Sequence, residues 1–248
     1  MNIKLNDFRN KKFGSEIFSS YDATIVAGDI ALGKIAYGNS GRIIGTAGPL
    51  VEELGIRSFS TNYGNSSTAS LTLPGDIEHG DLVLLFIGSN YGVSNVPGGF
   101  LELYKPDLGW HNVCFSRKIA EESDSNLLIS APLRGSEPWN MAAVIIKGGG
   151  FHAYSGNRAE SGTSIYAWSL PVSPEDLIIV FGSARIGSTT LGGTPNYNTT
   201  INLRNSDISL SQGLWYGVAE IEGTTSIYIS SPSATQGMGI ITVSISPR

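Results

Sequence analysis

The three histidines are the first residues to test for chemistry, because imidazole serves both as a metal ligand and as a general base. They are His79, His111 and His152, and none has a second ligand at the spacing that a metal site requires. His111 and Cys114 are three residues apart in an expected strand, where such side chains face opposite sides of the sheet. The sequence therefore predicts no metal site and no cofactor.

The acidic residues offer no pair placed for acid–base catalysis. Two adjacent pairs occur, Glu52-Glu53 and Glu121-Glu122. Neighbours on a chain cannot approach one bond from opposite sides, as the carboxylates of glycosidases must. Asp81 and Asp176 each open an apolar run, and the simpler interpretation is that each caps the turn before it. We therefore expect a protein that is not an enzyme and has no catalytic residues.

Aromatic residues are the better candidates for binding. Tyr91, Tyr154 and Tyr197 lie among Asn, Ser and Gly in or beside expected loops. Such rings can stack on the C–H faces of sugars while small polar neighbours bind the hydroxyl groups. Trp110 and Trp215 recur between two related halves of the chain, so we expect them to anchor the core. The three tyrosines do not recur, and they are the candidate contacts for a glycan or receptor.

The composition favours a β protein without nucleic-acid chemistry. Charged residues make up only 15% of the 248 residues, below the average of roughly 25%, and there are 31 glycines. The net charge of −5 does not suit a partner with a phosphate backbone. Cys114 is the single cysteine and lies in an apolar string, so we expect a buried, inert thiol. No apolar run is long enough to span a bilayer, and residues 1–12 lack a signal-peptide pattern, so we expect no membrane insertion.

Residues 1–48 are expected to form a docking and oligomerisation module. A short helix over 25–32 and a hairpin of strands 34–37 and 42–44 are predicted, joined by a turn at 38–41. So small a unit cannot bury a core alone and should pack against a partner chain. The polar stretch before it is a candidate arm for docking to a particle, and its basic residues are Lys4, Arg9, Lys11 and Lys12.

Residues 49–66 resemble a linker, and the strand pattern begins near residue 67. Short apolar runs at intervals of about ten to fifteen residues predict an antiparallel β-sandwich over 67–248. The expected strands are 68–73, 81–88, 100–105, 111–119, 126–131 and 139–147, then 163–170, 176–183, 197–203, 214–221, 225–230 and 237–246. The Gly-rich segment 148–150 is expected to be a flexible connection.

The strands fall into two pseudo-repeats, at about 67–148 and 160–248. Leu73-Pro74 precedes the run 81–86, and Leu170-Pro171 precedes the similar run 176–181. The two halves either form separate small domains or intertwine as one jelly-roll-like sandwich, and we expect the second, because the continuous apolar runs need cover on both faces.

Two segments resemble bacteriophage structural proteins. Positions 23–24, 29–37 and 44–46, read as Ala-Thr, Asp-Ile-Ala-Leu-Gly-Lys-Ile-Ala-Tyr and Ile-Gly-Thr, resemble a short module of tail-fibre and baseplate proteins. Positions 80–83, 96–100, 141–148 and 176–179 are similar to motifs of a β-sandwich domain found in phage particles. Phe100 stands where that domain usually has Trp, and Ile146-Lys147 where it has Tyr-Arg.

The resemblance implies a structural protein of the virion, made in the host cytoplasm and attached to other virion proteins of the tail, baseplate or neck. A homotrimeric tail or fibre component that displays its sandwich for host attachment, through surface glycans, is the leading hypothesis. A capsid or neck decoration protein is the alternative. A polysaccharide-degrading tailspike is a third, which the missing acidic site and the missing β-helix repeat disfavour.

Overall fold

The computed structural model describes residues 35–38, 41–44, 52–106, 111–185, 199–205, 210–219 and 223–248. The chain divides into two compact units, Met1–Glu52 and Glu53–Arg248. In the first unit, strands β1 (Ile35–Gly38) and β2 (Gly41–Ile44) pair in antiparallel register, as expected for the hairpin. The predicted helix at 25–32 and the basic arm lie outside the described residues.

The second unit begins with five strands that form one antiparallel sheet in the order β3-β7-β4-β6-β5. They are β3 (Gly55–Thr72), β4 (Leu82–Ser89), β5 (Leu101–Tyr104), β6 (Asn112–Ile119) and β7 (Leu128–Lys147), and a short 3-10 turn, η4 (Glu122–Asp124), precedes β7. The end of β3 and the start of β7 continue as a two-stranded ribbon beyond a register shift at 66–68. Apolar residues of this ribbon share a buried cluster with the outward side chains of β4, so the ribbon covers the outer face of the sheet.

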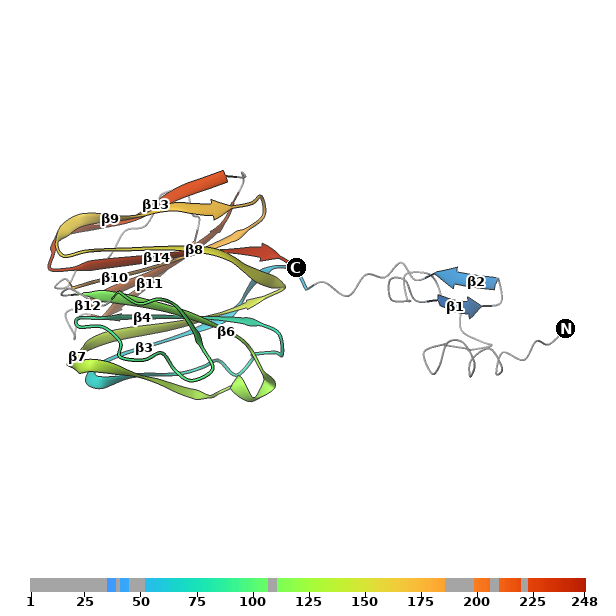
Figure 1. Ribbon diagram of the computed structural model, residues 1–248, viewed down its shortest axis with the longest axis horizontal. Coiled ribbons are helices and arrows are strands. Elements are labelled where there is room, and N and C mark those ends of the chain that lie inside the picture. Colours follow the sequence, from blue (N-terminus) through green and yellow to red (C-terminus); the bar gives the residue numbers. More distant parts are fainter. Residues whose placement is uncertain are drawn as a thin grey trace. The chain divides into compact units, whose positions relative to one another are not determined.

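The following strands build a second sheet in the order β11-β12-β10-β14-β8. They are β8 (Gly149–Ala159), β10 (Leu177–Arg185), β11 (Thr199–Asn205), β12 (Leu210–Val218) and β14 (Met238–Pro247). Strands β9 (Gly162–Val172) and β13 (Gly223–Thr235) form a separate ribbon. Its inward side chains share a buried cluster with β10 and β14, so this ribbon covers the outer face of the second sheet. Figure 1 shows the ribbon at the top of the unit, beside β14.

The two halves therefore repeat one architecture. Strands β4, β5 and β6 correspond in order and pairing to β10, β11 and β12. The long strand β3 corresponds to β8 followed by β9, and β7 corresponds to β13 followed by β14. Each half is a five-stranded sheet with a two-stranded ribbon on its outer face.

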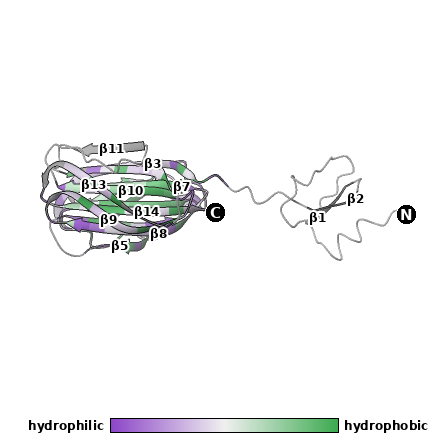
Figure 2. Cartoon of the chain, turned by 90° about the horizontal axis from the view of Figure 1, so that it is seen from above, coloured by the Kyte–Doolittle hydropathy of each residue, from purple (hydrophilic) through white to green (hydrophobic). Residues whose placement is uncertain are grey.

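The two sheets pack face to face around a shared core that draws buried side chains from both halves. At its centre, Phe86 of β4 stacks on the corresponding Phe181 of β10, with ring centroids 5.1 Å apart. Phe115 of β6 stacks on the other side of Phe86 at the same distance. Figure 2 shows the apolar colour concentrated in the inner strands β10 and β14. The residues expected in the core are buried, namely Leu82, Leu84, Phe86, Val144, Ile178 and Val180.

This β-sandwich-like arrangement corrects the expectation that the halves intertwine as a jelly roll. No sheet mixes strands of both halves in the part of the chain that the structure describes. The continuous apolar runs do have cover on both faces, but the cover on the outer side is a ribbon from the same half. The inference that both faces of these strands are buried was correct. The expectation that strands of the other half cover the outer face was wrong.

Three local expectations also need correction. Residues 55–66, assigned to a linker, belong to β3 and pair with β7. The glycines at 148–150 are no flexible connection: Gly148 makes the turn at φ 62°, a value that favours glycine, and β8 starts at Gly149. Strand β8 was missed because a bulge at His152 interrupts its alternation and most of its residues are small or polar.

Candidate functional site

The structure separates the three tyrosines expected at the surface. Tyr91 follows β4 and its side chain is half exposed. Tyr154 of β8 is instead a structural residue, because it packs against Phe115 and its hydroxyl donates a hydrogen bond to the Leu103 carbonyl, 2.6 Å away. Tyr197 lies outside the described residues. The prediction for Tyr154 is therefore wrong, since its ring and its hydroxyl are both used between the sheets.

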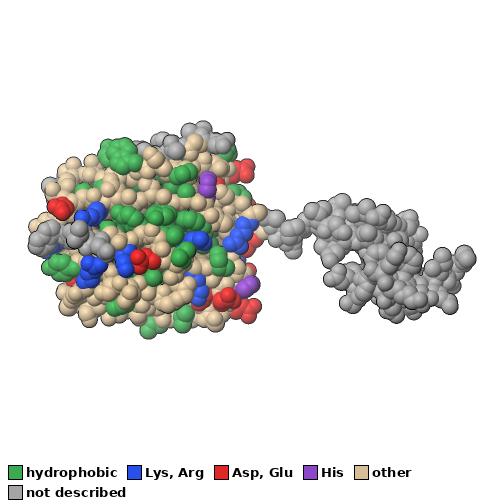
Figure 3. All heavy atoms as spheres, in the orientation of Figure 1, with side chains coloured by type: hydrophobic (Ala, Val, Ile, Leu, Met, Phe, Trp, Pro, Cys, Tyr) green, Lys and Arg blue, Asp and Glu red, His purple; other side chains and the backbone are tan. Residues whose placement is uncertain are grey.

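A cluster of aromatic side chains that the sequence analysis missed lies on the outer face of the β9–β13 ribbon. Tyr166 and Trp168 of β9 stack with ring centroids 4.8 Å apart and an angle of 14° between their planes. Tyr228 of β13 pairs with Tyr166 in register, and their ring centroids are 5.4 Å apart. Trp168 is 58% exposed and Tyr166 is 39% exposed. Figure 3 shows hydrophobic side chains protruding at the edge of the molecule over this ribbon. Tyr166, Trp168 and Tyr228 are called the aromatic cluster.

Strand alternation explains why these rings point outward. Ile165 and Ala167, their neighbours in β9, are buried against the second sheet, so the residues between them and after them face the other way. Side chains of β8 hold the strand in place: Asn157 Nδ2 donates to the Tyr166 carbonyl, and Ser155 Oγ to the Trp168 carbonyl, both at 2.7 Å. The sequence signal was present, as an aromatic–small–aromatic alternation at 166–168.

The first half of the chain shows what the fold requires at these positions. Asn62 of β3 donates to the Ser70 carbonyl at 2.8 Å, as Asn157 donates to the carbonyl of Tyr166. Ser70 is therefore the counterpart of Tyr166. The strand registers of the two ribbons then make Thr72 the counterpart of Trp168 and Ser130 the counterpart of Tyr228. The same ribbon is built in the first half with two serines and a threonine in place of the aromatic cluster. Packing of the ribbon does not need the aromatic rings.

The recurring aspartates Asp81 and Asp176 make the same contact in both halves, whereas the aromatic cluster occurs in one half only. Oδ2 of Asp81 accepts the Glu78 backbone N–H at 2.9 Å, and Oδ2 of Asp176 accepts that of Ser173 at the same distance. This confirms that each aspartate caps the turn before a buried strand. In each half a side chain at a strand bulge contacts this carboxylate. In the first half it is Arg57, whose Nε lies 2.8 Å from Oδ2 of Asp81.

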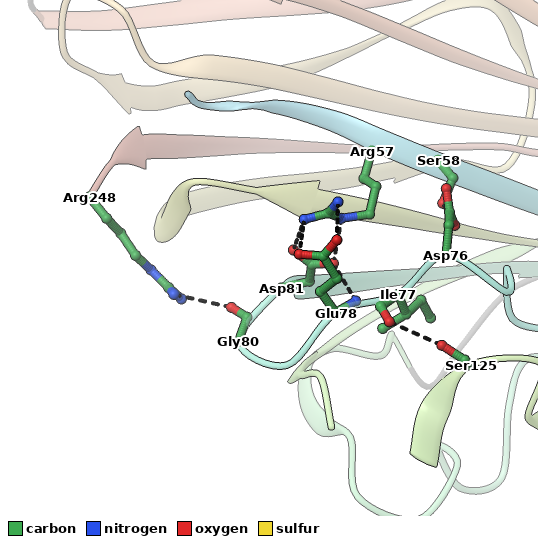
Figure 4. A network of polar contacts seen from close by, with 9 residues as sticks. All are labelled: Arg57, Ser58, Asp76, Ile77, Glu78, Gly80, Asp81, Ser125 and Arg248. Carbon is green, nitrogen blue, oxygen red and sulfur yellow. Dashed lines mark hydrogen bonds and ion pairs between the residues drawn. The ribbon is translucent and has the colours of Figure 1, made fainter. Parts of the chain in front are cut away.

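The partner of Asp176 is His152, whose Nδ1 lies 2.7 Å from Oδ2. Burial tends to raise the pKa of Asp176, but hydrogen bonds from Ser246 and from the Ser173 N–H, together with His152, hold that pKa below its ordinary value. Figure 4 shows the network of the first half, in which Arg57 also reaches Glu78. A contact kept in both halves serves the fold, and we assign these two aspartates to structure.

A buried polar cluster lies at the end of β4 and β10. His111 Nε2 and Asn140 Nδ2 each lie 3.0 Å from Oγ of Ser183. Burial, reinforced by the charge of Arg185, lowers the pKa of His111 to about 3, so its imidazole is neutral. A serine beside a neutral histidine is the geometry of an activated nucleophile. His111 Nδ1, however, has no orienting partner among the described residues, and all three side chains are buried.

The other predictions about single residues have simple outcomes. The thiol of Cys114 is buried as expected, and burial raises its pKa to about 12. Trp215 is a core residue of the second half, as expected, and Trp110 lies outside the described residues. The docking residues Lys4, Arg9, Lys11 and Lys12 are outside them as well.

No family model matches the chain, and no curated protein matches it. Within the described ranges, no helix has the length and apolarity to cross a bilayer, and no group of three metal-ligating side chains gathers.

Proposed function

We propose that this protein is a non-enzymatic attachment component of a bacteriophage particle. In this proposal residues 1–48 dock to other virion proteins and assemble three copies, and the β-sandwich-like unit is displayed as a binding head. The observation that carries the binding role is the exposed aromatic cluster, which occurs in one half of a duplicated fold and is not needed by the other.

Two further features support the proposal. The chain divides at residue 52 into a small N-terminal unit and a large unit with its own continuous core, a division that suits an anchor and a displayed head. The segments that resemble phage proteins fall in both units. A location on the tail rather than the head or neck follows from the resemblance of positions 23–46 to a tail-fibre module.

The test is a comparison of the full chain with a truncated chain of residues 53–248. We expect the full chain to be found by antibody labelling at the tail of purified particles and to form a trimer by light scattering. The truncated chain should stay folded, remain monomeric and be absent from particles, because it keeps the core clusters and loses the anchor. Labelling at the capsid or neck would favour a decoration protein, and normal incorporation of residues 53–248 would remove the anchor from 1–48.

A further inference from the structure

We propose that the aromatic cluster of Tyr166, Trp168 and Tyr228 is a binding site for an uncharged glycan, with the exposed face of the Trp168 indole as its stacking surface. This inference rests on the proposed attachment function and names the class of ligand and the residues that hold it.

The arrangement of the rings leaves one face of the Trp168 indole open. Tyr166 stacks against one face of the Trp168 indole, and Tyr228 packs beside Tyr166 from the paired strand β13. Among the described residues no other ring lies against Trp168, whose side chain keeps 58% of its surface exposed. Tyr166 thus fixes the orientation of the indole and leaves its opposite face to a ligand. A rigid, exposed indole face suits the apolar C–H face of a pyranose ring.

The ribbon that carries the aromatic cluster is uncharged. Strands β9 and β13 contain no charged residue, and apart from the three aromatic residues their polar side chains are all serine or threonine. Ser164 and Ser230 form the register pair next to Tyr166 and Tyr228, so hydroxyl groups stand beside the rings. Hydroxyls that both donate and accept complement the hydroxyls of a neutral sugar. A nucleic acid or an anionic lipid surface would require basic residues at this place.

The small size of the aromatic cluster suits a small ligand. A stable protein interface takes about 20–30 residues from each partner. The aromatic cluster has three rings with small polar neighbours, an area that suits one or two sugar rings better than a folded partner. The corresponding ribbon of the first half carries Ser70, Thr72 and Ser130 at these positions, so the rings are an addition to one half.

The experiment uses the full-length protein on an array of neutral oligosaccharides built from hexoses, deoxyhexoses and N-acetylhexosamines, with uronic-acid and sialylated glycans as comparators. Calorimetry with the best neutral oligosaccharide then compares the wild type with the triple variant Tyr166→Ser, Trp168→Thr, Tyr228→Ser. This variant installs the residues that the first half already accommodates, so it should fold. Tyr63→Ala removes a comparably exposed tyrosine (49%) from β3 and is the matched control.

We expect binding of at least one neutral glycan, a loss of affinity of about tenfold or more in the triple variant, and no change in Tyr63→Ala. Binding confined to charged glycans, no glycan binding at all, or equal affinity of the wild type and the triple variant would overturn the inference. These results are separate from the test of the attachment role: a protein absent from particles that still binds glycan at Trp168 refutes the virion role alone, and a particle protein that binds no neutral glycan refutes the ligand alone.

Discussion

At the scale of single residues, the core is organised around an aromatic stack that joins the two halves. Phe86 is fully buried and contacts Phe115 within its own sheet and Phe181 across the core. Phe86→Ala should lower the free energy of unfolding by roughly 3–5 kcal/mol, because truncation leaves a cavity between two rings. Denaturant titration of the full chain measures it. Phe59→Ala, at a side chain that is 42% exposed, is the control and should cost less than about 1 kcal/mol.

Another residue-scale prediction concerns pH. Glu137 of β7 is buried, and its carboxylate accepts the Tyr91 backbone N–H. Burial raises the pKa of Glu137 to about 7, although the N–H groups of Tyr91 and Asn90 act to lower it. The folded state thus favours the protonated acid, and the stability this gives is present below pH 4.5 and lost as the pH rises through 7.

Glu137→Gln should therefore raise the melting temperature at pH 8 and leave it nearly unchanged at pH 4.5, since the amide is neutral at both. Thermal unfolding at the two pH values, expressed as variant minus wild type, isolates this group from others that titrate. Glu160→Gln, at an exposed side chain for which no ion pair is seen in the described part of the chain, is the matched control and should leave the melting temperature nearly unchanged at both pH values. An equal shift of the Glu137 variant at both pH values would show that its charge is not responsible.

At the scale of elements, the capped turns before β4 and β10 are the most closely repeated feature. Asp81 holds the Glu78 N–H and the Arg57 guanidinium with a carboxylate that is 4% exposed. Asp81→Ala should cost roughly 2–4 kcal/mol in denaturant, because the turn N–H loses its acceptor and the largely buried Arg57 loses its buried carboxylate partner. Glu78→Ala, which removes only the exposed partner of Arg57, should cost less than about 1 kcal/mol. Equal costs would mean that the cap does not position the strand.

Elements with strong local signals were predictable from the sequence. The apolar runs of β4 and β10, opened by aspartates and preceded by Leu-Pro, gave the buried strands and the repetition. The first half of β3 has polar alternation at the sheet edge, and β8 is interrupted by the bulge at His152, so neither carries a strand signal. The exposure of the aromatic cluster depends on which face of β9 is buried. The pairing of β9 with β13 decides which face that is.

At the scale of the whole molecule, duplication explains both the stability and the proposed function. Each half brings its own sheet and its own outer cover, and the two join through one shared core. With two equivalent ribbons, one can keep serine and threonine on its outer face while the other acquires aromatic rings. In the proposed function, the large unit is then the support for a binding site that its fold does not need. The sequence alone could not show this division, because it requires the strand order of both sheets.

The central claim is that the large unit is the part that binds the host surface. Under the proposed function, the most direct measurement is adsorption to the host of a phage that carries this chain, in the presence of purified residues 53–248. We predict that this unit blocks adsorption in a dose-dependent way and that the Tyr166→Ser, Trp168→Thr, Tyr228→Ser variant does not, while Tyr63→Ala blocks as well as the wild type. Adsorption that continues unchanged at saturating concentrations of the folded unit would contradict the account.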